Sequence, residues 1–127
     1  MLRVSNLKRG FGSGATRLEV LEGIDLQCMK GELVDMMGPA GWGKTTLLNI
    51  IGGLLEADSG SINLASFDYG TDHSKKLVDL RRRGVGWIFQ DYHLLDHLSA
   101  LDNVALALEL SGLESNKAET QAKLALE

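Results

Sequence analysis

The sequence predicts an α/β fold in which an N-terminal antiparallel β layer is followed by a strand, a glycine-rich loop and a helix. Three observations indicate this fold. First, 15 glycines and only one proline separate short apolar runs along the 127 residues. Second, one apolar run leads directly into a glycine-rich loop and then into an apolar helical segment. Third, apolar residues beyond residue 90 recur at helical spacing.

The first part of the chain is predicted to form the β layer and the strand that feeds the loop. Residues 2–7 are rich in apolar side chains, and residues 24–29 alternate between apolar and polar ones before a turn at 30–32. Residues 33–37 are predicted to form the strand that feeds the loop, and their apolar character suits a parallel strand covered on both faces. Asp35 is the exception, since such strands are usually apolar throughout. A carboxylate buried there without a partner would cost several kcal/mol or stay protonated.

Beyond the loop, helices and short strands are predicted to alternate until the chain becomes helical. These elements are helix 45–51, strand 61–64 after a turn at 58–60, helix 74–83 and strand 85–89. Ser99 and Asp102 have the spacing of a capping box, which predicts a helix that begins there and ends at Ser111 and Gly112. The amphipathic segment 115–127 has no C-cap glycine and no following strand, so we expect a truncated domain.

Composition excludes several classes of protein. With 44% hydrophobic residues, 24% charged residues and a net charge of −4, the chain is neither disordered nor collagenous. An acidic chain is a poor partner for nucleic acid, so we interpret the basic run 81–83 as a solvated helix face. The single cysteine, Cys28, excludes an intramolecular disulfide. No membrane span or secretory signal is recognisable, which predicts a cytoplasmic protein with at most a peripheral membrane role.

The loop between residues 38 and 45 has the pattern G-x-x-x-x-G-K-[ST], which predicts a phosphate-binding loop. Its glycines let backbone N–H groups converge on phosphate oxygens, and Lys44 would reach the β- and γ-phosphates. Thr45 would hold Mg²⁺, and the positive end of the following helix would face the same anion. The alternative is a glycine-rich turn with a solvated lysine. The strand before the loop and the helix after it favour nucleotide binding.

Nearly the whole chain resembles the ATP-binding subunit of ATP-binding cassette (ABC) transporters, in the order of that family's motifs. The matching blocks are residues 21–26, 30–32, 38–46, 54–62, 86–95 and 98–104. The most specific block surrounds Gln90 and looks like the family's Q-loop. The sequences of these blocks are most similar to the lipoprotein-releasing and macrolide-export branch of the family. The resemblance implies a P-loop NTPase (RecA-like) core with an N-terminal antiparallel β layer and the start of an α-helical subdomain.

The resemblance also implies which residues act. Lys44 and Gln90 would be catalytic residues, and Thr45 and Gln90 would bind the metal ion. Gln90 would contact Mg²⁺ or the attacking water, although on its own it could be any polar residue that ends a strand. Phe11 matches an aromatic residue that stacks on adenine, the alternative being a core or turn aromatic. The residues expected to bind the nucleotide are Phe11, Gly38, Pro39, Ala40, Gly41, Trp42, Gly43, Lys44, Thr45 and Thr46.

Two loop positions depart from the family pattern, since Trp42 stands where a small residue is general and Ala40 lacks a polar side chain. The family's signature motif, Walker B carboxylates and switch histidine are not among the 127 residues. We therefore expect one truncated ATP-binding domain, with residues 1–89 forming the β layer and P-loop core. Residues 90–127 would hold the Q-loop and the start of the helical subdomain. Such a chain alone is not expected to hydrolyse ATP.

By resemblance, the protein is the ATP-binding subunit of an ABC transporter that couples ATP hydrolysis to export or extraction of a substrate. Its cofactors would be ATP and Mg²⁺, and its partners a transmembrane permease subunit and a second ATP-binding subunit. It would lie on the inner face of the cell membrane. Two alternatives stay open: a nucleotide-binding module without hydrolysis, and a different P-loop NTPase such as a GTPase or small-molecule kinase. His73, His93 and His97 do not have the spacing of a metal site and have only one cysteine as a further ligand of the type zinc prefers, so they are expected at the surface.

Overall fold

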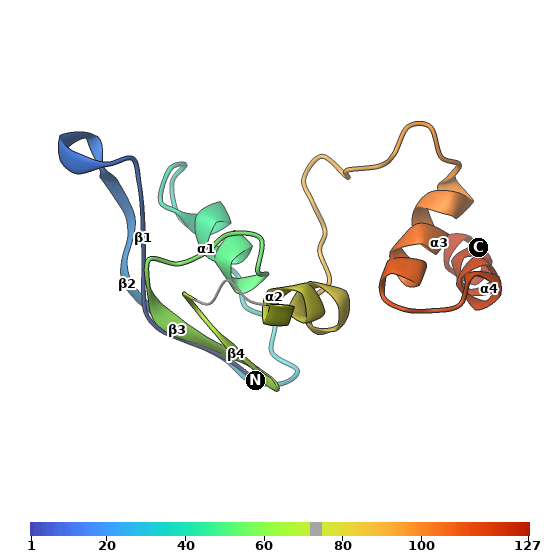
Figure 1. Ribbon diagram of the computed structural model, residues 1–127, viewed down its shortest axis with the longest axis horizontal. Helices are drawn as coiled ribbons and strands as arrows, with labels where there is room; N and C mark the ends of the chain where they lie inside the picture. Colours follow the sequence, from blue (N-terminus) through green and yellow to red (C-terminus); the bar gives the residue numbers. More distant parts are fainter. Residues whose placement is uncertain (72–74) are drawn as a thin grey trace. The chain divides into compact units, whose positions relative to one another are not determined.

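A computed structural model describes residues 1–71 and 75–127, with the main chain alone for residues 75 and 76 (Figure 1). The contacts divide the chain into two compact units, Met1–Val85 and Gly86–Glu127. His73, which was predicted at the surface, and Ser74, the first residue of the helix predicted over 74–83, lie outside the described residues.

The first unit is built on an antiparallel sheet with the strand order β2-β1-β3-β4 (Figure 1). Its strands are β1 (Leu2–Phe11), β2 (Leu18–Cys28), β3 (Ser59–Leu64) and β4 (Phe67–Tyr69). A short 3₁₀ turn, η1 (Gly14–Thr16), connects β1 to β2. The predicted antiparallel layer is confirmed. Strand β1 continues past the predicted residues 2–7 to Phe11, and β2 begins at Leu18, well before the predicted residues 24–29, and ends at Cys28. Strand β4 was not predicted.

Helix α1 (Lys44–Ile51) follows the glycine-rich loop, as predicted, and packs its apolar face into the core of this unit. Leu47 and Ile50 are buried three residues apart, as one face of a helix requires. The core residues are Val4, Leu7, Leu21, Leu47, Ile50, Ala57, Ile62, Tyr69, Leu77 and Leu80. The buried Tyr69 hydroxyl donates a hydrogen bond to the Ile51 carbonyl, and burial raises its pKa to about 12.

The helix predicted over 74–83 is present across 75–84 but is less regular than expected. It consists of α2 (Lys75–Asp79) and a π-helical turn, η2 (Leu80–Gly84). The basic run 81–83 is exposed, as predicted, although the Arg81 guanidinium also donates to the Gly53 carbonyl at 2.7 Å. The run therefore has a structural contact as well as a solvated face.

The strands predicted at 33–37 and 85–89 are wrong for this chain, because neither segment pairs with any strand in the described residues. An extended segment becomes a strand only when a neighbour completes its hydrogen-bond ladder. Without such neighbours several of their apolar side chains face solvent: Leu33 and Ile88 are each 99% exposed, whereas Met36 and Val85 pack against the core of the first unit. Asp35 is exposed as well, so the predicted cost of burying its carboxylate does not arise.

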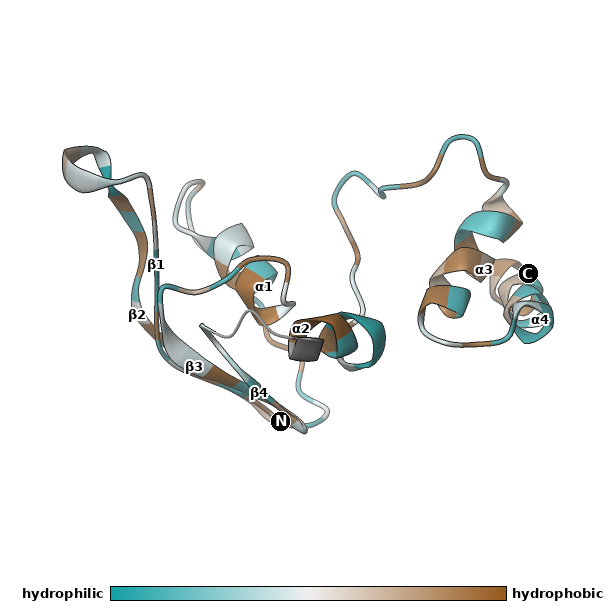
Figure 2. Ribbon diagram, viewed as in Figure 1, coloured by the Kyte–Doolittle hydropathy of each residue, from teal (hydrophilic) through white to brown (hydrophobic). Residues whose placement is uncertain are grey.

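The second unit contains helices α3 (Ala100–Leu110) and α4 (Ser115–Leu126). The predicted capping box is confirmed: Ser99 Oγ accepts from the Asp102 N–H at 3.1 Å, and the Asp102 carboxylate accepts from the Ser99 N–H at 3.3 Å. Helix α3 is mostly hydrophobic and α4 more hydrophilic (Figure 2). Across residues 1–71 and 75–127, no helix combines the length and apolarity needed to cross a membrane.

Candidate nucleotide-binding site

The phosphate-loop pattern forms a tight turn that ends at the first residue of α1. Gly41 and Gly43 have φ values of 83° and 78°, a left-handed conformation that side chains with a Cβ rarely adopt. A Cβ at Gly43 would lie only 2.9 Å from side-chain carbons of both Val20 and Leu21. Glycine at this position therefore lets the loop close against β2.

At the start of α1, several backbone donors have no hydrogen-bond partner among the described residues. The first intrahelical hydrogen bond runs from the Leu47 N–H to the Gly43 carbonyl at 2.8 Å, so the N–H groups of Lys44, Thr45 and Thr46 have no helical acceptor. Gly43 supplies no side-chain cap, and the first turn contains no acidic residue. These donors, together with the positive end of the helix, suit an anion such as a phosphate group.

A cavity of about 380 Å³ lies over these donors. It is lined by Val20, Ala40, Gly41, Gly43, Lys44, Thr45 and Thr46. Val20 was not among the predicted site residues because it lies outside the strand predicted over 24–29. The alternation of Leu18 and Val20 with Glu19 was the signal that β2 begins earlier.

The side chains of Lys44 and Thr45 have the chemistry that a magnesium-bound triphosphate requires. Lys44 Nζ donates to the carbonyls of Gly38 and Pro39 at 2.6 and 2.7 Å, which holds the ammonium across the loop. Among the described residues, no hydrogen bond engages the Thr45 hydroxyl. A free hydroxyl is an oxygen ligand of the kind that Mg²⁺ prefers. The residues present therefore fit both a phosphate chain and its metal.

Two of the residues predicted to bind the nucleotide, Trp42 and Phe11, do not line this cavity. Trp42 is 72% exposed and does not line the cavity. Phe11 is the last residue of β1, is 41% exposed and pairs with Leu18 on β2. Val20, in the cavity wall, is two residues further along β2, or about 7 Å along the strand. This register places the Phe11 end of the hairpin near the phosphate loop.

Gln90 belongs to the second unit, where it is exposed on a turn. The segment around it is organised by aromatic side chains: Trp87 stacks on Phe89 with ring centroids 5.4 Å apart, and Phe89 contacts the His93 ring at 4.3 Å. His93 and His97 are exposed, as predicted. The role of Gln90 in the site stays a prediction.

Comparison with known proteins agrees with this fold and motif order. A family model described as ABC transporter matches residues 21–127. The macrolide export ATP-binding/permease protein MacB 1 of Aeromonas hydrophila is 43% identical over 127 residues, all of this chain and 20% of that protein. The lipoprotein-releasing system ATP-binding protein LolD of Legionella pneumophila is 38% identical over 122 residues, 96% of this chain and 54% of that protein.

A solved structure has the same fold. The ATP-binding cassette MJ0796, in a dimeric post-hydrolysis state bound to ADP and Pi, superposes with a TM-score of 0.88 and 29% identity. The match covers 99% of this chain and 56% of that one, so the chain spans about half of the cassette. Because the family model covers most of the sequence and the cassette fold covers nearly all of it, the chain belongs to the ABC transporter family.

Proposed function

We propose that this chain is part of the ATP-binding subunit of an ABC transporter that couples ATP hydrolysis to export or extraction of a substrate. The observation that carries the proposal is the cavity over the start of α1, where unpaired backbone donors, Lys44 and the Thr45 hydroxyl meet. This combination of groups suits a magnesium-bound triphosphate, because it offers both charge-assisted donors and an oxygen ligand for the metal.

Each residue has a distinct proposed task. The loop amides and Lys44 bind the β- and γ-phosphate oxygens, and Thr45 holds Mg²⁺. Bound Mg²⁺ neutralises charge on the phosphate oxygens. Gln90 offers a carbonyl acceptor and an N–H₂ donor without a net charge, which suits a residue that contacts the metal or orients a water molecule. Phe11 stacks on the adenine ring, whose π face suits an aromatic partner.

The names of the relatives support the proposed partners. MacB 1 is an ATP-binding/permease protein, LolD is the ATP-binding protein of a lipoprotein-releasing system, and MJ0796 forms a dimer. We propose that this protein likewise works with a transmembrane permease subunit and a second ATP-binding subunit. It would then lie peripherally on the inner face of the cell membrane.

Nucleotide titration tests the central claim. Binding of a fluorescent ATP analogue with Mg²⁺ should weaken about a hundredfold in Lys44→Ala, because the substitution removes charge-assisted hydrogen bonds to the terminal phosphates. Lys123→Ala is the matched control, since Lys123 pairs with Glu119 on α4 in the second unit. Equal affinity of the wild-type and Lys44→Ala chains would overturn the proposal. A preference for GTP would favour a different P-loop NTPase.

Phosphate release tests the enzymatic part. We expect sustained ATP hydrolysis from the full-length protein and negligible turnover from residues 1–127. Acceleration needs groups that act more strongly in the transition state than in the ground state, such as a carboxylate that positions water. Lys44→Ala is the control for contaminating ATPases. Multiple turnovers from residues 1–127 that this substitution abolishes would contradict the expected division of tasks.

A further inference from the structure

The turn end of the β1–β2 hairpin, where Phe11 pairs with Leu18, is held by one carboxylate, Asp58, which immediately precedes β3. The Asp58 N–H donates to the Lys8 carbonyl at 2.9 Å, and Asp58 Oδ2 accepts from the Gly10 N–H at 2.7 Å. The last β1–β3 backbone pair is Lys8 with Ser59. The Asp58 side chain therefore continues the hydrogen-bond ladder along β1 after the neighbouring strand has ended.

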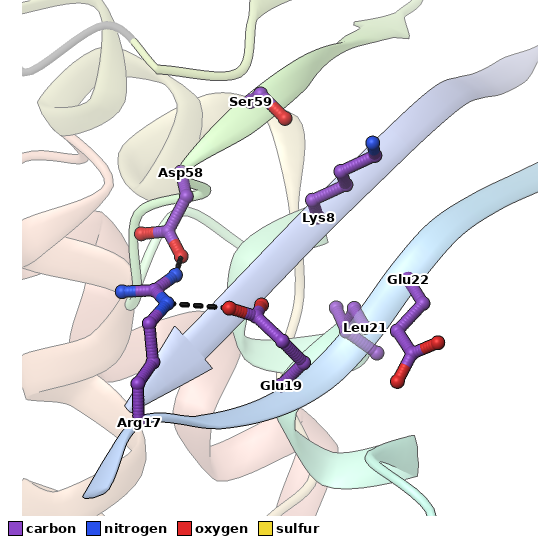
Figure 3. Close-up of a pocket in the computed structure, with 7 residues that line it drawn as sticks. All are labelled: Lys8, Arg17, Glu19, Leu21, Glu22, Asp58 and Ser59. Atoms are coloured by element: carbon purple, nitrogen blue, oxygen red, sulfur yellow. Dashed lines mark hydrogen bonds and ion pairs between the residues drawn. The ribbon is translucent and has the colours of Figure 1, made fainter. Parts of the chain in front are cut away.

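Two arginines converge on the same carboxylate. Arg9 Nη1 donates to Asp58 Oδ1 at 2.8 Å, and Arg17 Nη2 donates to Asp58 Oδ2 at 2.5 Å. Figure 3 shows Arg17 reaching between Asp58 and Glu19 at the edge of a cavity of about 640 Å³. The Gly10 N–H, and then the arginines, hold the pKa of Asp58 below its ordinary value. Asp58 is therefore an anion at neutral pH.

The arrangement extends to Phe11, the proposed adenine partner. The Arg9 guanidinium lies over the Phe11 ring, 5.0 Å from the ring centroid, within the range of a cation–π contact. Its buried Nε has no hydrogen-bond partner in the described part of the chain, so its orientation depends on Asp58. Asp58 thus fixes both the peptide N–H just before Phe11 and the cation that covers one face of the ring.

We propose that Asp58 is a positioning residue for adenine recognition, acting through Gly10 and Arg9 to fix the ring plane of Phe11. Arg9 occupies one face of the ring, and the base takes the opposite face. Asp58 touches neither the base nor the phosphates. This inference rests on the proposed function, because it requires that Phe11 stack on the base.

Competition between two ligands tests it. Tripolyphosphate has the phosphate chain of ATP but no base, so its affinity depends on the phosphate loop and not on Phe11. Both affinities are measured with Mg²⁺ by displacement of a fluorescent nucleotide. Asp58→Ala should weaken ATP about threefold to tenfold and leave tripolyphosphate unchanged. Asp58→Asn should weaken ATP less, because its carbonyl can still accept from Gly10.

A double-mutant cycle separates positioning from a general structural role. If Asp58 acts through Phe11, Asp58→Ala should have no further effect on ATP affinity in a Phe11→Ala background. Glu19→Gln is the matched control, because it weakens the neighbouring ion pair with Arg17 while leaving Asp58 in place. This control should leave both affinities unchanged.

The outcomes are distinguishable. Unchanged ATP affinity in Asp58→Ala, a parallel loss of ATP and tripolyphosphate, or a further loss in the Phe11→Ala background would each overturn the role of Asp58. If Lys44→Ala and Phe11→Ala both leave wild-type ATP affinity intact, the proposed function itself fails. A base-dependent loss confined to the Phe11-containing background supports the inference.

Discussion

The phosphate loop and the turn end of the β1–β2 hairpin carry the two halves of the proposed nucleotide site, and they are held in different ways. The shape of the loop comes from its own backbone, through the left-handed conformations of Gly41 and Gly43 and the adjacent start of α1. The hairpin end is held by Asp58, which is 48 residues from its partner Gly10. The loop is shaped mainly by its own backbone, with one close approach to β2 at Gly43, whereas the hairpin end depends on a side chain from a distant part of the sequence.

This difference separates stability from selectivity. A change in the loop alters backbone geometry that the rest of the unit packs against, so it should lower the free energy of unfolding. A change at the hairpin end alters side-chain hydrogen bonds on a partly exposed surface, so it should mainly change the ratio of ATP affinity to phosphate affinity. Four experiments test this division, in decreasing order of expected effect.

The largest effect is expected for Gly43→Ala. The new methyl group would lie 2.9 Å from side-chain carbons of Val20 and Leu21, and alanine would have to adopt a left-handed backbone conformation. Together these two effects should lower the free energy of unfolding by about 3 kcal/mol. Gly41→Ala is the matched control, because Gly41 has a similar φ of 83° but a Cβ there would meet no atom within 4 Å. It should cost about 1 kcal/mol. Urea unfolding followed by circular dichroism measures both, and equal losses would show that contact with β2 is unimportant.

Phe11→Leu should have the next largest effect, and it should change only the part of the binding free energy that comes from the adenine base. Leucine keeps an apolar side chain at the end of β1 but removes the aromatic face, so ATP binding should weaken by about 1–2 kcal/mol. Tripolyphosphate binding should not change. Calorimetric titration with each ligand measures the difference, and a loss shared equally by the two ligands would remove the distinction between the two halves of the site.

A smaller effect is expected from the protonation of Asp58. Because its pKa in the folded chain is lowered, its contribution to stability is complete above the unfolded-state pKa of about 4 and is lost as the pH falls through the folded-state value. The contribution should stay below about 1 kcal/mol, because the groups are partly exposed. Wild-type and Asp58→Asn unfolding curves should differ at pH 7 and converge at acid pH. A constant difference would assign the stabilisation to another group.

The smallest effect on stability is expected for Gly10→Ala, within about 0.5 kcal/mol. Its Cβ would meet the flexible ends of the Arg17 and Glu19 side chains, which can move, rather than fixed backbone. The same glycine-to-alanine change at Gly43 should cost several times more. Thermal unfolding of the two variants side by side measures this ratio, and similar losses would contradict the proposed contrast between backbone shape and side-chain clamp.

The same distinction explains which features the sequence could predict. The phosphate loop, α1 and the Ser99–Asp102 capping box depend on residues a few positions apart, so local spacing reveals them. Strand pairing, in contrast, depends on residues that are far apart in the sequence, so local spacing does not reveal it. Residues 33–37 and 85–89 have the composition of strands, but only a neighbouring strand makes them so, and the composition of a segment says nothing of its neighbour.

The residues missed around the site have the same physical cause. Val20 enters the cavity wall because β2 begins at Leu18, which is set by its register with β1. The sequence predicts Asp58 only as part of a turn over 58–60, whereas β3 already begins at Ser59 and Asp58 forms a bend just before it. Its contacts with Arg9, Gly10 and Arg17 depend on the three-dimensional path of the hairpin, and no spacing in the sequence encodes them.

The exposed indole of Trp42 gives the phosphate loop its own optical reporter. The chain has two tryptophans, and the two compact units contain one each, Trp42 in the first and Trp87 in the second. Trp42 is 72% exposed, whereas Trp87 stacks on Phe89. Iodide should therefore quench Trp42 emission selectively, and shielding of that fraction by a ligand would report events at the loop without any attached dye.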